Sequence, residues 1–133
     1  MMKRRKSREL AFEMFYALEL SGEPREKVVE RFSSTDKAKD KEVLEYALQM
    51  FNWAVDSSDE LSDELSSVIK NWSLDRLSKV DKSLIYLACA EIMNGGTPST
   101  VVIDEFVEMA KTFGDANSPA FVNGVIDSWH KKG

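Results

Sequence analysis

The residues of this chain that are best suited to chemistry are cations and aromatic rings near its beginning. Residues 1–8 contain five basic side chains and no acidic one: Lys3, Arg4, Arg5, Lys6 and Arg8. Arg8, Phe12 and Tyr16 follow at intervals of four, which places them along one face of a helix. Cations neutralise phosphates and aromatic planes stack on unpaired bases, so the combination is typical of a surface that binds single-stranded RNA. A solvated basic tail is the competing interpretation, and for Phe12 a place in the core is favoured.

Residue types that support catalysis are scarce. The one histidine, His130, lies near the C-terminus, and the one cysteine, Cys89, lies in an apolar stretch, where a thiol behaves as a small hydrophobic group. Glycine-rich phosphate loops are absent from the sequence, and a single cysteine with a single histidine cannot build a structural zinc site. The sequence therefore predicts no catalytic residue, no metal and no cofactor, and an enzyme is the least favoured class.

A cluster of carboxylates marks a second candidate surface between residues 56 and 64. Its members are Asp56, Asp59, Glu60, Asp63 and Glu64. Their spacing is typical of a solvated helix face, without the burial that paired acid and base catalysts need. The alternative is that they face a basic protein, and we therefore treat them as candidate protein-partner residues.

Composition indicates one globular domain over residues 1–133, with residues 1–6 as a basic arm. The chain is 43% hydrophobic and 31% charged, which is typical of a soluble protein. Its net charge is −5, so the basic arm stands out on an acidic chain and suggests a nucleic-acid contact at one end. No apolar run reaches the length of a membrane helix, and Glu9, Glu13 and Glu19 interrupt any signal-like segment. We therefore expect a cytoplasmic protein without a membrane partner.

The elements that must position these residues are helical. Glycines followed by prolines at 22–24, 95–98 and 114–119 are typical of helix-to-helix connections. Apolar residues at helical spacing predict helices over about 7–18, 24–32, 43–55, 57–72, 83–93, 98–113 and 118–129, with a polar loop over 33–40. The expectation is an all-α fold with about seven helices and no strand.

Three local features refine this interpretation. Residues 57–60 match a capping box, and Ser73 fits the N-cap of a short turn. Gly124, inside the last expected helix, costs about 1 kcal/mol relative to alanine, and we expect it to allow close helix packing. The alternative is that Phe121 and Asn123 flank an exposed recognition surface.

Three blocks of the sequence resemble signatures of the bacterial transcription antitermination factor NusB family. They are Arg4-Arg5-Lys6-Ser7-Arg8-Glu9 with Phe15-Tyr16, then residues 72–85, then residues 103–127 with Phe121-Val122-Asn123-Gly124. The blocks follow the family order and cover nearly the whole chain. Lys6-Ser7 is a departure, since arginine and alanine are commoner there.

The resemblance implies two perpendicular three-helix bundles and no catalysis. It also implies binding to the boxA element of ribosomal RNA transcripts, together with the ribosomal protein NusE, in a complex that is recruited to RNA polymerase. By position, the family's RNA contacts fall on Arg4, Arg5, Lys6, Arg8, Tyr16, Asp81, Lys82, Phe113, Asn117 and Phe121. Family members occur as monomers or dimers, and a homodimer would be able to cover the RNA surface. The same fold also occurs appended to ribosomal RNA cytosine methyltransferases.

We therefore expect the basic arm and the rings of the first and last helices to converge on one surface that holds unpaired RNA. The alternative function is a purely protein-binding helical adaptor, for which residues 1–8 would be dispensable. The placement of the five cations and Tyr16 discriminates between the two hypotheses.

Overall fold

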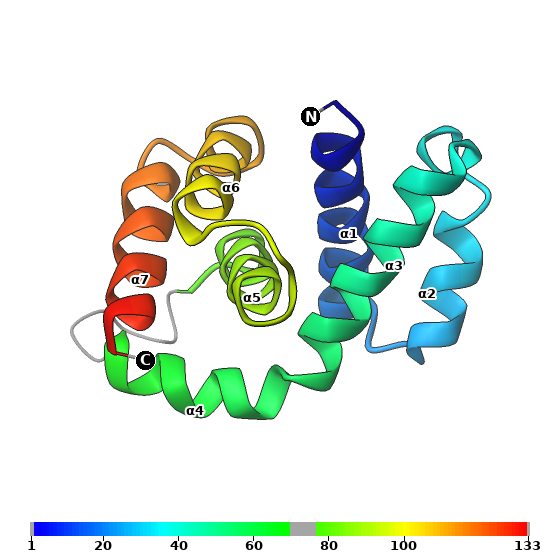
Figure 1. The fold of residues 1–133 in the computed structure, drawn as a ribbon. Coiled ribbons are helices and arrows are strands. Elements are labelled where there is room, and N and C mark those ends of the chain that lie inside the picture. Colours follow the sequence, from blue (N-terminus) through cyan, green and yellow to red (C-terminus); the bar gives the residue numbers. More distant parts are fainter. Residues whose placement is uncertain (1, 70–76, 133) are drawn as a thin grey trace.

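The computed structural model describes residues 2–69 and 77–132, and all regular structure in these ranges is helical. The elements are α1 (Met2–Ser21), α2 (Arg25–Phe32), the 3₁₀ helix η1 (Asp36–Lys39), α3 (Lys41–Asp56), α4 (Ser58–Val68), α5 (Lys79–Asn94), α6 (Ser99–Phe113) and α7 (Ser118–Lys132) (Figure 1). The prediction of an all-α fold with about seven helices is confirmed.

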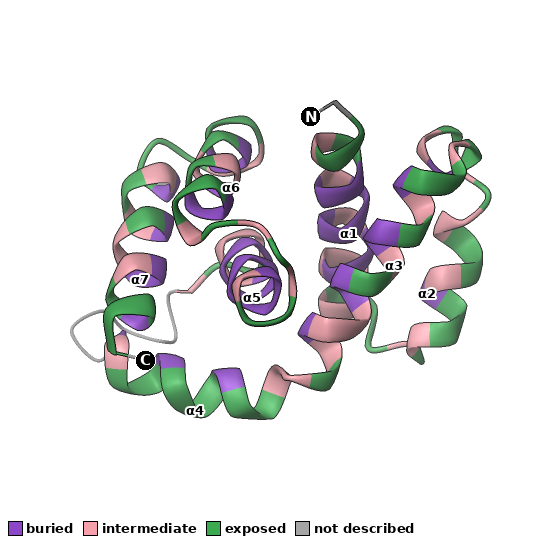
Figure 2. Cartoon of the chain, in the orientation of Figure 1, coloured by how far each residue is buried: buried purple, intermediate pink, exposed green. Residues whose placement is uncertain are grey.

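Helix α5 lies at the centre of the molecule. It contacts α1 and α3 on one side and α4, α6 and α7 on the other. In Figure 1 α5 is viewed nearly along its axis, while α1 lies in the plane of the page and runs from top to bottom, so the two helices cross steeply. Residues 83–91 are all buried, as expected for a helix that is apolar nearly all round. Figure 2 shows that the buried faces of the surrounding helices turn toward this centre.

The start of α1 differs from the expectation. The helix begins at Met2 rather than near Ser7, so the residues expected as a basic arm form its first turns. The apolar spacing predicts the later start because its stripe begins only at Leu10. Cations at a helix N-terminus also oppose the helix dipole. Ion pairs offset this effect: Lys3 lies 3.4 Å from Asp40 and 3.3 Å from Glu42, and Arg5 lies 3.2 Å from Glu9.

The connections around α3 also differ from the expectation. The polar stretch 33–40 contains η1, because Ala38 is drawn into the core, and Asp40 then caps α3 by accepting from the N–H groups of Glu42 and Val43. The capping box at residues 57–60 is wrong. Ser57 makes no side-chain capping bond, because its N–H donates to Trp53 and ends α3 just where α4 begins. Ser73 lies outside the described residues, and α5 is capped by Ser78.

A buried polar cluster joins α1, α3 and α5. The Glu91 carboxylate is fully buried and Arg8 is 3% exposed. Arg8 donates from Nε to Oε1 at 2.9 Å and from Nη2 to Oε2 at 2.7 Å, and the Tyr46 hydroxyl donates to Oε2 at 2.7 Å. Buried charges are tolerated only when they are paired and hydrogen-bonded, so these contacts fix how α1 and α3 sit on α5.

The protonation states within this cluster favour the same contacts. Burial alone would lower the pKa of Arg8, but the hydrogen bonds and charge of Glu91, with a further contribution from Glu105, raise it. Burial raises the pKa of Tyr46 to about 12, and the hydrogen bond to Glu91 acts in the same direction. The phenol therefore stays protonated and remains a donor at neutral pH.

Gly124 does not pack closely against another helix. A Cβ atom added there would meet no atom within 4 Å, so the close-packing expectation is wrong. Asn123 beside it is exposed, which agrees with the alternative of an open face on α7.

Gly124→Ala should raise the free energy of unfolding by about 0.5–1 kcal/mol, because glycine loses the most backbone freedom in a helix. Urea denaturation measures the change. Gly22→Ala is the matched control, since its Cβ would also meet open space but its φ is +68°, and it should lower the stability by about 1 kcal/mol. A loss of stability in Gly124→Ala would contradict the open face.

Tyr46 should make stability pH-dependent at high pH. Its phenol holds the proton more tightly in the folded chain, with a pKa of about 12, than in the unfolded chain, with a pKa of about 10. Its contribution is therefore complete below pH 10 and is lost as the pH rises from about 10 to 12. The melting-temperature gap between the unmodified chain and Tyr46→Phe, followed by circular dichroism, should narrow across that window. A constant gap would rule out this titration.

Candidate nucleic-acid interface

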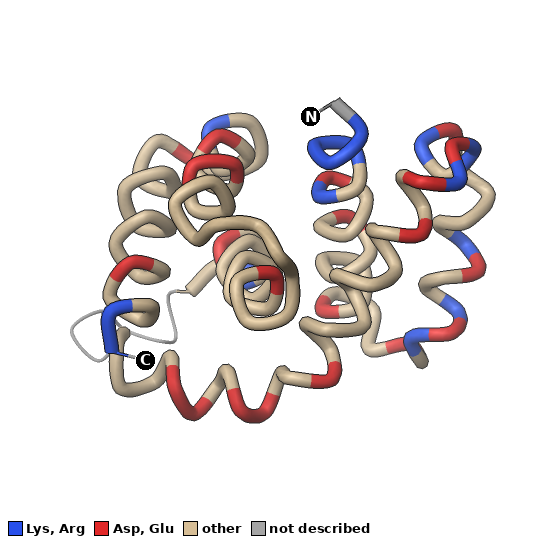
Figure 3. The backbone as a smooth tube through the Cα atoms, viewed as in Figure 1, with Lys and Arg blue, Asp and Glu red and all other residues tan. Residues whose placement is uncertain are grey.

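The first turns of α1 present cations on two sides of the helix. Figure 3 shows the basic start of α1 in blue. Arg4 and Lys6 are exposed and Arg5 is half-buried. The Arg4 guanidinium lies over the Tyr46 ring of α3, with Cζ 3.5 Å from the ring centroid. Arg5 lies on the α6 side, where its Nη1 atom is 3.9 Å from Glu105. Lys6 forms no ion pair with any described residue, so it is free to bind a phosphate.

Arg8 does not join this surface. We expect it beside the other cations, but its side chain is buried and its guanidinium is bound to Glu91, with Glu105 3.6 Å away. The reason is that position 8 lies on the face of α1 that packs against α5, where the buried Glu91 carboxylate binds the guanidinium. A phosphate contact from Arg8 would require breaking a buried ion pair and does not fit this conformation.

An aromatic row connects α1 to α6. Phe12 stacks on Tyr16, with ring centroids 5.9 Å apart, and on Phe113, with centroids 4.8 Å apart. Phe12 is 5% exposed, so the core position favoured for it is confirmed. Tyr16 and Phe113 are partly exposed at the two ends of the row. The row therefore offers two accessible rings, and the buried Phe12 holds them in place.

Asn117 and Phe121 lie at the turn into α7, directly after Phe113 ends α6. Asn117 is exposed, and Phe121 is half-buried against the core. The Asp115 carboxylate accepts from the N–H groups of Asn117 at 2.8 Å and Ser118 at 3.1 Å, which fixes the turn. The exposed side-chain amide of Asn117 therefore lies only four positions after Phe113 of the aromatic row.

Asp81 and Lys82 lie in the first turn of α5, near the far end of α1. Lys82 donates to Glu19 at 2.6 Å and lies 5.3 Å from the centroid of the Tyr86 ring. The Oδ1 atom of Asp81 is buried and has no hydrogen-bond partner among the residues that the structure describes. Because Glu19 is one turn beyond Tyr16, the candidate residues extend along α1. From Arg4 to Tyr16 the span is about 18 Å, so a ligand that reaches both ends must be elongated.

The structure separates the carboxylates that were expected to face a protein partner. Asp56 is paired with Arg25 at 2.8 Å, and Glu64 accepts the indole N–H of Trp129 at 2.8 Å. The remaining three are exposed on α4 without an ion pair or side-chain hydrogen bond to the described chain: Asp59, Glu60 and Asp63. Figure 3 shows this acidic face along α4, far from the basic start of α1.

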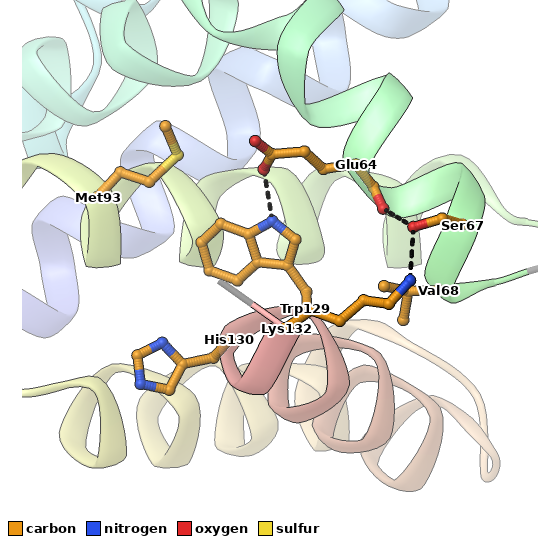
Figure 4. Close-up of a pocket in the computed structure, with 7 residues that line it drawn as sticks. All are labelled: Glu64, Ser67, Val68, Met93, Trp129, His130 and Lys132. Atoms are coloured by element: carbon orange, nitrogen blue, oxygen red, sulfur yellow. Dashed lines mark hydrogen bonds between the residues drawn. The ribbon is translucent and has the colours of Figure 1, made fainter.

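A cavity of about 440 Å³ lies beside the acidic face, between α4, the end of α5 and α7. Figure 4 shows its lining residues: Glu64, Ser67, Val68, Met93, Trp129, His130 and Lys132. The walls of the cavity are mostly apolar, and the Met93 side chain that lines it is 40% exposed. Sequence reasoning missed this cavity because α4 and α7 are far apart in the chain. The only hint of the cavity in the sequence is that two large apolar residues, Met93 and Trp129, lie near the ends of expected helices.

The described residues carry no group of three or more side chains suited to hold a metal ion. Burial, with a smaller contribution from the charge of Glu64, raises the pKa of the Cys89 thiol far above its ordinary value, so this thiol is not a nucleophile at neutral pH. None of the helices in the described ranges is both long and apolar enough to cross a membrane.

Comparison with known proteins identifies the family and supports the all-helical fold. The model of the NusB family matches residues 5–131. The transcription antitermination protein NusB of Koribacter versatilis is 35% identical over 126 residues, which cover 94% of this chain and 86% of that protein. The NusB structure from T. maritima is 33% identical, with a TM-score of 0.86 and coverage of 97% and 91% of the two chains.

A solved complex of the antitermination factors NusB and NusE with double-stranded RNA contains a chain that is 27% identical to this one. It superimposes with a TM-score of 0.86 and covers 100% of this chain and 99% of that chain. Sequence and fold therefore agree over nearly the whole length, and the chain belongs to the NusB family.

Proposed function

We propose that this chain is a cytoplasmic transcription antitermination factor without catalytic activity. It binds boxA-type single-stranded RNA of ribosomal RNA transcripts together with the ribosomal protein NusE, and it brings both to RNA polymerase. Family membership and the relative solved with NusE and RNA support this function. The observation that carries the proposal is the aromatic row, whose accessible ends Tyr16 and Phe113 lie on the same helices as the cations and the turn into α7.

The available contacts divide between phosphates and bases. Arg4, Arg5 and Lys6 supply positive charge for phosphates, while Tyr16 and Phe113 offer planes on which bases stack. Single-stranded RNA exposes those base planes, whereas a duplex hides them, so the rings favour unpaired RNA.

Three further contacts concern hydrogen bonds. Asn117 is exposed at the end of the row and has both donors and acceptors for a base edge. Asp81 offers carboxylate acceptors that suit an amino group of a base, but its buried Oδ1 atom, which has no partner among the described residues, becomes accessible only if the first turn of α5 shifts. Lys82 is already bound to Glu19, so a phosphate contact there requires an exchange of partners.

The acidic face of α4 is the surface that we assign to the basic ribosomal protein. Three carboxylates on α4 are exposed and form no ion pair with the described residues: Asp59, Glu60 and Asp63. The lysines or arginines of a partner could therefore pair with them without displacing a cation of the described residues. The adjacent cavity gives this surface an apolar pocket for a side chain of the partner. RNA and protein would then bind at separate places on the molecule.

Tyr16→Ala should weaken binding of a uracil- and adenine-rich single-stranded RNA 12-mer by about 1–3 kcal/mol, because a stacking plane is lost. Fluorescence anisotropy measures the affinity over a potassium chloride series. For the unmodified chain the slope of log K against log salt should be about −2, from three phosphate contacts. Phe32→Ala removes a half-buried ring of α2, away from the row, and should leave the RNA affinity unchanged. Equal affinity of Tyr16→Ala and the unmodified chain, with intact circular dichroism, would refute the RNA site.

Neutralising the acidic face should slow association with NusE. The triple variant Asp59→Asn, Glu60→Gln, Asp63→Asn removes charges that steer a basic partner, so the association rate should fall several-fold at low salt. Biolayer interferometry measures the rates. Glu26→Gln with Glu30→Gln, which are exposed on α2, is the matched control and should leave them unchanged.

The same preparations separate the two function classes. NusE binding without any RNA binding would favour a protein-binding adaptor over the proposed factor. Unchanged NusE kinetics in the triple variant would place the protein contact elsewhere. Size-exclusion chromatography with and without RNA shows whether a homodimer competes with RNA for the same surface.

A further inference from the structure

The exposed cations of the proposed RNA surface are connected to one buried carboxylate. Glu91 is fully buried in α5 and accepts three hydrogen bonds, two from Arg8 and one from the Tyr46 hydroxyl. Neither Arg8 nor Tyr46 is accessible enough to contact RNA, since Arg8 is 3% and Tyr46 9% exposed. Each of the two residues, however, contacts a more accessible side chain: Tyr46 contacts Arg4, and Arg8 contacts Glu105.

The first connection runs through α3. The Tyr46 ring is the platform on which the Arg4 guanidinium lies, 3.5 Å from Cζ to the ring centroid. The hydroxyl of the same ring is tied to Glu91, so the orientation of the platform is fixed from inside the protein. Gly95 leaves room for this arrangement, because a Cβ there would come within 3.3 Å of the hydroxyl and 2.9 Å of the Glu91 carbonyl.

The second connection runs through α6. Arg8 is held by Glu91 through Nε and Nη2, and its remaining nitrogen, Nη1, is 3.6 Å from Glu105. The same oxygen of Glu105 lies 3.9 Å from Nη1 of Arg5. Arg5 is also held by Glu9 through Nε at 3.2 Å, so its guanidinium has one near and one more distant carboxylate partner.

We propose that Glu91 is a positioning residue for RNA binding: through Tyr46 it orients Arg4, and through Arg8 and Glu105 it orients Arg5. This inference rests on the proposed RNA-binding function. Long arginine side chains lose rotamer freedom when they bind a phosphate, and that loss is smaller when they are already oriented. The buried carboxylate therefore contributes to affinity at a distance from the ligand.

Two single variants test the connections, one for the first connection and one for both together, and a third variant is the control. Tyr46→Phe removes only the hydroxyl bond and should release Arg4 alone. Glu91→Gln removes the charge that holds both connections and should release Arg4 and Arg5. Ser7→Ala is the matched control, since it removes a buried hydrogen bond between α1 and the Val43 carbonyl without touching the Glu91 contacts.

Salt-dependent binding of the uracil- and adenine-rich RNA 12-mer is the first measurement. We expect a released arginine to lose its phosphate contact, and each such contact on a single strand contributes about 0.7 to the slope of log K against log salt. The slope should therefore become shallower by about 0.7 for Tyr46→Phe and by up to about 1.4 for Glu91→Gln, in which Glu9 still binds Arg5. Affinity at low salt should fall about 3- to 10-fold for Tyr46→Phe. Ser7→Ala should lower the melting temperature but keep the slope and affinity of the unmodified chain. A role in folding alone would lower the stability of all three variants and change the slope of none.

NMR relaxation of the arginine Nε–Hε groups is the second measurement, and it needs no RNA. In the unmodified chain the Arg4 and Arg5 groups should be ordered; Tyr46→Phe should mobilise Arg4 only. The positioning role is overturned if Arg4 is as mobile in the unmodified chain as in Tyr46→Phe, or if Tyr46→Phe binds with an unchanged slope and affinity. A chain with ordered arginines that binds no RNA at any salt concentration would overturn the proposed function itself, and with it this inference.

Discussion

The ion pair between Arg8 and Glu91 is the contact on which the rest of this structure depends. A carboxylate and a guanidinium that leave water together are stable only when each satisfies the other, and this pair does so with two hydrogen bonds supplemented by the Tyr46 hydroxyl. The pair joins residues 83 positions apart in the chain. It fixes both the place and the rotation of α1 on α5.

The rotation of α1 determines which residues reach the surface. With Arg8 directed at α5, the helix period places Arg4 toward α3, Arg5 toward α6, and Phe12 against Phe113. The proposed RNA surface therefore consists of a cationic end and an aromatic row along one helix, with the buried Arg8 beneath it. The acidic face of α4 lies on another part of the molecule (Figure 3). Such a separation lets one small protein bind a nucleic acid and a basic protein at the same time.

Helical periodicity predicted much of this fold, and local chemistry explains where it failed. The apolar spacing predicts the helices and a core position for Phe12. Such a spacing predicts which face of a helix is buried, even when the elements that pack against that face are unknown. Arg8 was assigned to the surface because a charge at helical spacing is usually exposed, and its partner Glu91 cannot be identified from the sequence alone. Gly124 was taken as a packing residue because glycine inside a helix usually has that role, whereas here it faces open space.

The functional residues were predictable to different degrees. The cations of the first turn follow from charge counting, whereas Asp81, Phe113 and Asn117 came only from family resemblance, since nothing in their spacing marks them. The α4–α7 cavity and the contacts behind the proposed roles of Tyr46 and Glu91 cannot be predicted from the sequence, because each arises where distant segments pack together. Contacts of this kind depend on the three-dimensional arrangement rather than on any local pattern.

The most direct test of this account is an NMR titration of the folded chain with the RNA 12-mer, following backbone amides and arginine side chains. We expect chemical-shift changes in the first turns of α1, at Tyr16, at the end of α6 and at the turn into α7. The Arg8 Nε–Hε signal should keep its position, because the ion pair with Glu91 stays intact. Shifts concentrated on α2, or an Arg8 signal that moves with the RNA concentration, would contradict this account.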